Sequence, residues 1–139
     1  MEVTTSNRLK LVVMIYDAAI SSLKQAEQCL KRNDSTKMNY YISRTQLIVN
    51  ELNNTLDFKQ GKEIAATLSE LYYFINRQLA EVIKDRDDKK IEQSIHILMQ
   101  LKEAWEDICQ KADTIDSTLK NVPNEEADGY QGRGSIIYG

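Results

Sequence analysis

The sequence predicts an all-α protein, an antiparallel up-and-down four-helix bundle. Helix breakers are nearly absent from residues 7–120, because the only proline is Pro123 and four of the five glycines fall at Gly129 or later. Strong helix formers dominate that region, and no segment alternates apolar and polar residues as a strand would. Three short polar turns divide it into four segments of similar length, which is typical of a bundle with short connections. We expect one bundle domain over 1–120 and a flexible C-terminal tail, rich in glycine and acidic residues, over 121–139.

The first helix is predicted over 7–32, and it carries more apolar residues than one buried face needs. Residues 9–20 read LKLVVMIYDAAI, in which only Lys10 and Asp17 are polar. An ordinary surface helix has one apolar stripe with polar residues opposite it. One stripe, with spacings of three and four, consists of Leu9, Val12, Val13, Tyr16, Ala19, Ile20 and Leu23. A second apolar face remains, consisting of Leu11, Met14, Ile15 and Ala18.

Three further helices are predicted over 35–58, 62–84 and 88–112. The turn Asn33-Asp34-Ser35 offers Asp34 or Ser35 as a helix N-cap. Gly61 is expected to adopt the left-handed conformation that ends the second helix after Phe58. The charged run over 84–90 contains aspartates that can cap the fourth helix. Apolar spacing continues past 112, so this helix either reaches about Lys120 or is followed by a short extra C-terminal helix.

Each of these helices has a predicted core stripe with spacings of three and four. The core residues expected on the helix over 35–58 are Met38, Tyr41, Ile42, Thr45, Ile48, Val49, Leu52 and Leu56. Those on the helix over 62–84 are Ile64, Leu68, Leu71, Tyr72, Ile75, Leu79 and Val82. Those on the helix over 88–112 are Ile91, Ile95, Leu98, Leu101, Trp105, Ile108 and Ala112.

Residue content argues against catalysis, metal sites and nucleic-acid binding. The single histidine, His96, follows Glu92 at a spacing of four, whereas a di-metal bundle uses Glu-x-x-His from two helices. No glycine-rich phosphate loop is present. We therefore predict no enzymatic activity, no metal and no cofactor. The net charge is -3 and the sequence shows no Lys/Arg cluster, so no positively charged surface for nucleic-acid binding is predicted.

The cysteines and the first apolar run indicate where the protein works. Cys29 and Cys109 match no zinc or CxxC spacing, so we predict buried free thiols, which suit a reducing cytoplasm. The run over 11–20 is shorter than the roughly 20 apolar residues of a membrane span. Asp17 interrupts it and no small-residue cleavage site follows, so it does not resemble a signal peptide. We expect a soluble cytoplasmic protein without membrane insertion.

Apolar residues outside the core stripes are the candidates for function. Isolated exposed apolar residues are common, but the first helix has four on adjacent turns. Helical partners dock through residues at i, i+3, i+4 and i+7, so such a face favours a helical client or a second copy of the chain. Further surplus residues are Tyr73, Phe74, Ile97 and Ala104. The predicted partner-binding residues are Leu11, Met14, Ile15, Ala18, Tyr40 and Leu47.

Several short motifs, in order along residues 3–112, resemble the flagellin-specific export chaperones of the FliS type. The longest is similar to the family's junction between the second and third helices and stands here as Glu51-Leu52, Leu56-Asp57-Phe58, Gly61 and Glu63-Ile64-Ala65. The other matching motifs are Val13-Met14-Ile15-Tyr16-Asp17, Asn39-Tyr40, Arg44-Thr45-Gln46, Leu71-Tyr72, Arg77-x-Leu79 and Ala104-Trp105.

The resemblance implies a small cytoplasmic four-helix bundle without enzymatic activity. Such a protein binds the disordered C-terminal segment of flagellin, prevents its premature polymerisation and helps to deliver it to the flagellar export apparatus. Two positions depart from the family pattern. Asn7-Arg8 stands where a proline is usual, and Asp17-Ala18-Ala19 stands where Asp-Gly-Ala is common, so Ala18 replaces the glycine. The alternative prediction is a structural homodimeric bundle, or an adaptor, without a flagellin client.

Overall fold

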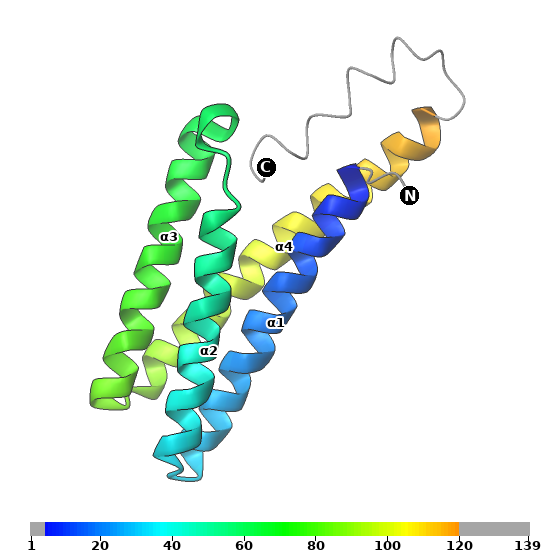
Figure 1. The fold of residues 1–139 in the computed structure, drawn as a ribbon. Coiled ribbons are helices and arrows are strands. Elements are labelled where there is room, and N and C mark those ends of the chain that lie inside the picture. The colour runs from blue at the N-terminus through cyan, green and yellow to red at the C-terminus, as the bar shows by residue number, and fades with distance from the viewer. Residues whose placement is uncertain (1–4, 120–139) are drawn as a thin grey trace.

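A computed structural model describes the backbone of residues 5–119 and the side chains of residues 7–114. It contains α1 (Thr5–Lys31), α2 (Ser35–Asn54), α3 (Phe58–Asp85) and α4 (Asp88–Leu119). The chain passes up and down the molecule, so consecutive helices are antiparallel (Figure 1). The predicted four-helix bundle is confirmed. α4 runs without a break to Leu119, in agreement with the longer of the two predicted versions of this helix. The predicted tail over 121–139 lies outside the described residues.

The turn between α1 and α2 is defined by backbone hydrogen bonds and one side chain. Asn33 adopts a left-handed conformation with φ 57°. Its N–H donates to the Leu30 carbonyl at 3.1 Å, and the Asp34 N–H donates to the Cys29 carbonyl at 2.9 Å, which is the Schellman arrangement. The Asp34 carboxylate then accepts from the Lys37 N–H at 3.1 Å. Of the two predicted N-caps, Asp34 is the one used.

The junction between α2 and α3 differs from the prediction. α2 ends at Asn54, four residues before Phe58, and Gly61 does not have a positive φ. Leu56 is buried, so the chain leaves α2 before it, and Asp57 starts α3 by accepting from the N–H groups of two residues, Lys59 and Gln60, at 3.1 Å each. Instead of Gly61, Lys62 carries the positive φ, with φ 46° and ψ -119°, and it makes a kink within α3.

The third turn also ends in a left-handed residue. Arg86 has φ 57°, and its N–H donates to the Val82 carbonyl at 2.8 Å. Asp87 accepts from the Lys89 N–H at 3.0 Å, so an aspartate of the charged run caps α4 as predicted. Lys90 pairs with Asp85 at 2.7 Å, and this ion pair holds the pKa of the Asp85 carboxyl below its usual value.

The core lies between all four helices, with α1 packed against α2 and α4 and with α3 diagonal to α1. Tyr16 and Tyr72 are almost completely buried, and their hydroxyls form a hydrogen bond across that diagonal. Neither Cys29 nor Cys109 forms a disulfide, and both are buried, as expected. The predicted core residues that are only partly buried and form its margin are Val13, Tyr41, Ile48, Leu71 and Leu101.

Two predicted core residues were wrong. Ile64 is 57% exposed because Ala65, three residues before Leu68, takes the inward position on this turn of α3. Ile108 is 38% exposed because its neighbour Cys109 takes the inward position. Ile97, expected on the outside, is half-buried and packs against the core.

α3 is joined to its neighbours through amide side chains. On the α2 side the Gln46 amide donates to the Asn76 carbonyl at 3.1 Å, and the Asn76 amide donates to Asn50 Oδ1 at 2.7 Å. On the α4 side the Gln78 amide donates to Gln93 Oε1 at 2.9 Å. The Gln78 carbonyl oxygen also accepts from the Ser94 hydroxyl at 3.0 Å. Directional polar bonds therefore supplement apolar packing along both seams of α3.

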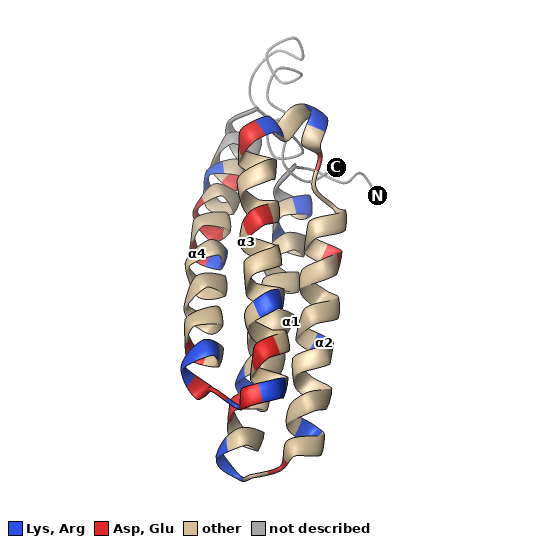
Figure 2. Ribbon diagram, turned by 90° about the vertical axis from the view of Figure 1, so that its left-hand side faces the viewer, with Lys and Arg blue, Asp and Glu red and all other residues tan. Residues whose placement is uncertain are grey.

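Charged residues are unevenly distributed along the bundle. Figure 2 shows Lys, Arg, Asp and Glu concentrated at the α3–α4 turn, with others along α3 and α4 and at the opposite end, and long uncharged stretches along α2. Within residues 5–119, none of the helices combines the length and the hydropathy that crossing a bilayer requires.

Candidate partner-binding surfaces

The predicted second face of α1 is largely open to solvent. Leu11 and Met14 are 55% and 63% exposed, and Ala18 is exposed too. Ile15 is the exception, because it is half-buried and packs against the core. The structure therefore places three of the four predicted contact residues on the surface and the fourth at the margin of the core.

These four residues form one apolar surface that extends to both flanks of α1. Met14 lines a hollow shared with α4. The other flank faces α2, as the hydrogen bond from the Ser22 hydroxyl to the Tyr41 carbonyl at 3.2 Å indicates. Ser22 lies four, seven and eleven residues after Ala18, Ile15 and Leu11, respectively, and residues at these spacings lie on one side of an α-helix.

α2 adds two exposed apolar side chains on its outer side. Tyr40 is 59% and Leu47 is 66% exposed, and their spacing of seven places them on one face. The Tyr40 ring meets the Tyr41 ring edge-on, with centroids 5.1 Å apart and planes at 75°, so it is supported by a partly buried neighbour. Leu47 is the most exposed of the large apolar side chains described.

The antiparallel register brings the two sets together. Since Ser22 lies opposite Tyr41, residues six to eight positions further along α2 lie opposite residues six to eight positions earlier on α1. By this register Ile48, which is half-buried, lies level with Ile15 along the bundle, and Leu47 lies on the outer side of the same turn of α2. We call this surface the α1–α2 face, and its residues are Leu11, Ile15, Ala18, Tyr40, Leu47 and Ile48.

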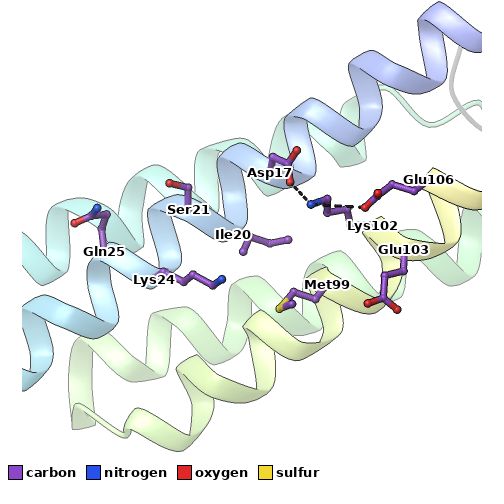
Figure 3. A pocket seen from close by; sticks show the side chains of 9 residues that line it. All are labelled: Asp17, Ile20, Ser21, Lys24, Gln25, Met99, Lys102, Glu103 and Glu106. Atoms are coloured by element: carbon purple, nitrogen blue, oxygen red, sulfur yellow. Dashed lines mark ion pairs between the residues drawn. The ribbon is translucent and has the colours of Figure 1, made fainter. Parts of the chain in front are cut away.

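The opposite flank of α1 carries two hollows, both shared with α4. The larger, which we call the Met99 hollow, has a volume of about 560 Å³. Lys102 reaches across it, with its Nζ 2.5 Å from Asp17 Oδ1 and 3.6 Å from Glu106 Oε1 (Figure 3). The hydrogen bond with Asp17 raises the pKa of Lys102, so its ammonium stays protonated at neutral pH. The lining residues are Asp17, Ile20, Ser21, Lys24, Gln25, Met99, Lys102, Glu103 and Glu106.

The smaller hollow, which we call the Met14 hollow, has a volume of about 360 Å³ and lies nearer the end of α4. Its apolar lining consists of Val13, Met14 and Cys109. Lys10 and Asp113 form an ion pair of 3.3 Å at its rim. Burial raises the pKa of the Cys109 thiol, so this group remains a neutral, weakly polar part of the lining.

Other exposed apolar residues lie apart from these surfaces or were not singled out by the sequence. Tyr73 and Phe74, which were expected to be outside, are 64% and 41% exposed on α3, and Ala104 is exposed on α4. Sequence reasoning missed Phe58, at 52% exposed, although the family-like junction motif contains it. It also missed Met99, because the pairing of α1 with α4 across the hollow is not visible in either helix alone.

The described surfaces offer apolar area and ion pairs. No group of three or more His, Cys, Asp and Glu side chains within the described residues is placed to hold a metal ion. His96 is exposed on α4.

Comparison with known proteins identifies the family. The family described as "Flagellar protein FliS" matches residues 1–112. The chain belongs to the FliS family. The flagellar secretion chaperone FliS of Salmonella typhimurium is 35% identical over 104 residues, which cover 74% of this chain and 77% of that protein. The corresponding Campylobacter jejuni FliS is 30% identical over 99 residues, covering 71% of this chain and 77% of the relative.

A solved structure supports the FliS fold independently. The crystal structure of a bacterial flagellar chaperone matches with a TM-score of 0.71, covering 76% of this chain and 85% of that one. At 21% identity this likeness concerns the fold alone. The relatives of this FliS-family chain are named as chaperones, which is not an enzymatic role.

Proposed function

We propose that this protein is a flagellar secretion chaperone that binds the disordered C-terminal segment of flagellin in the cytoplasm. It prevents premature polymerisation of flagellin and assists its delivery to the flagellar export apparatus. Membership of the FliS family and the names of the 30–35% identical relatives support this function. The structural observation that carries it is the α1–α2 face, where Leu11 and Leu47 are 55% and 66% exposed on helices whose other sides are packed.

Binding works by burial of apolar surface. Each Å² of apolar area removed from water contributes about 25 cal/mol, so a few hundred Å² favour binding by several kcal/mol before the client's ordering cost. The helices of the bundle are already formed, so that cost falls mainly on the flagellin segment. The contact residues we assign are Leu11, Met14, Ile15, Ala18, Tyr40 and Leu47.

Sequestration follows from the same contacts. A client helix docks through apolar residues at i, i+3, i+4 and i+7. While these residues lie against the α1–α2 face, they are not available to another flagellin subunit. Release at the export apparatus then frees the client for assembly.

Light scattering combined with titration tests the proposal. The chain alone is measured first, and the C-terminal segment of flagellin from the same organism is then added. A one-to-one complex supports the chaperone function. A chain that stays a dimer and forms no complex with this segment contradicts the proposal. Such a result favours the homodimeric alternative, in which the exposed apolar residues of α1 pair with those of a second copy.

A further inference from the structure

The Met14 hollow is an apolar site that no described residue fills. It lies between the N-terminal half of α1 and the C-terminal half of α4 and has a volume of about 360 Å³, within the usual range of small ligand pockets of about 300–1,000 Å³. Met14 is 63% exposed at its edge. The rim carries Lys10 together with the acidic Glu106 and Asp113, so charge of one sign does not select the occupant.

The chain itself contains a short apolar segment beyond the described end of α4. α4 is described as far as Leu119. The residues after it are mostly polar, acidic or glycine, and the one run of three consecutive apolar or aromatic residues is Ile136-Ile137-Tyr138. Residues 120–135 separate this run from the end of α4.

The connection is long enough to reach the Met14 hollow. At 1.5 Å per residue, α4 rises about 15 Å between Cys109, in the hollow, and Leu119. A random-coil chain of about sixteen residues has a root-mean-square end-to-end distance of about 20–24 Å. Met99, in the second hollow, lies about 30 Å from Leu119 on the same scale, beyond that mean distance. A flexible chain reaches points within its root-mean-square distance more often than points beyond it, which favours the Met14 hollow over the Met99 hollow.

The geometry points to Ile136-Ile137-Tyr138 of the same chain as the occupant of the Met14 hollow, where the segment competes with the flagellin client for α1. The docking stands on the hollow and the sequence alone, whereas the competition rests on the proposed function. A linker of this kind gives an effective concentration in the millimolar range, so a weak, short apolar contact is populated yet easily displaced. The segment shields Met14 until a client with more apolar contacts replaces it.

Methionine ε-methyl NMR of the full chain tests the docking without any client. The comparison is between the wild type and the double variant I136D/I137D, and N124D/Q131D adds the same charge outside the apolar run. We expect the Met14 signal to shift in I136D/I137D and to stay in place in N124D/Q131D. Met38, which is 1% exposed, serves as the internal reference for an intact core.

Three results would overturn the docking. A Met14 signal that is the same in the wild type and in I136D/I137D shows that the segment does not occupy the hollow. A shift of the Met99 signal instead of Met14 places the segment elsewhere. A Met14 difference that disappears on dilution shows that a second copy, not the same chain, supplies the occupant.

Titration with the flagellin C-terminal segment tests the competition. Removing the competitor is expected to strengthen binding by about two- to tenfold in I136D/I137D, with N124D/Q131D at the wild-type affinity. Equal affinity of all three chains, together with a shifted Met14 signal, overturns the competition and leaves the docking intact. Failure of every chain to bind the flagellin segment contradicts the proposed function, while the NMR result still decides the docking.

Discussion

Leu47 offers the sharpest test of the α1–α2 face, because it is exposed enough to be changed without disturbing the core. Complete burial of a leucine side chain contributes about 1.5–3 kcal/mol. With 66% of Leu47 exposed, its coverage by a client contributes about 1–2 kcal/mol, or about 5–30-fold in Kd. Leu47→Ala keeps one methyl group and is expected to weaken binding about fivefold. Leu47→Asp also places a carboxylate against the client and is expected to weaken binding more than 30-fold.

Calorimetric titration with the flagellin C-terminal segment measures both variants. Thermal unfolding followed by circular dichroism is expected to stay close to wild type, because a surface substitution changes stability by about 0.5 kcal/mol or less. The matched control is Tyr73→Asp, since Tyr73 is 64% exposed but lies on α3, diagonal to α1. Wild-type Kd values for Leu47→Ala and Leu47→Asp would remove the α1–α2 face from the binding site, and equal losses in Tyr73→Asp would show that the effect is not local.

Three further predictions concern stability and pH. Ile15→Asp places a carboxylate at the margin of the core and is expected to lower the free energy of unfolding by about 1–3 kcal/mol in a urea titration; an unchanged midpoint contradicts the packing of Ile15. Lys62→Gly relieves a positive φ and is expected to raise that free energy by about 1 kcal/mol, and a fall would show that the kink is unstrained. Lys102→Met removes an ion pair worth at most about 1 kcal/mol. Because folding raises the pKa of Lys102, this contribution is complete below the unfolded pKa of about 10.5 and is lost as the pH rises through the folded value. The free energies of unfolding of wild type and Lys102→Met, measured by urea titration, are therefore expected to converge at alkaline pH. A difference that stays constant with pH contradicts the assignment.

Most of the fold was predictable from local patterns. The scarcity of glycine and proline before residue 120, the three-four apolar spacing and the Asp34 cap identified four helices and most of their buried residues. The junction after α2 was not predictable in detail. There, burial of Leu56 and capping by Asp57 outweigh the local preference of Gly61 for a left-handed turn. Ile64 was wrongly placed in the core because Ala65, three residues before Leu68, takes the inward position instead.

The candidate surfaces were predictable only in part. Exposure of Leu11, Met14, Tyr40 and Leu47 is confirmed, while their part in binding stays a prediction. Helical periodicity on one helix shows which residues leave the core stripe, but it does not show which neighbour covers the flank. For that reason Ile15 looked like a surface residue, and the two hollows on the α4 side, formed by residues from both helices, were not foreseen.

The amide seams of α3 bear on how a chaperone of helical segments keeps its own helices in place. Contacts between leucine and isoleucine side chains tolerate sliding and replacement, so a foreign apolar helix could enter a purely apolar bundle. The bonds among Gln46, Asn50 and Asn76 require particular donors and acceptors in one register. A foreign helix without those groups leaves them without protein partners, which costs most for the half-buried Gln46 and Asn76. The seams thus favour the bundle's own α3 over a foreign helix in that position, and a client that binds as proposed is left the outer faces.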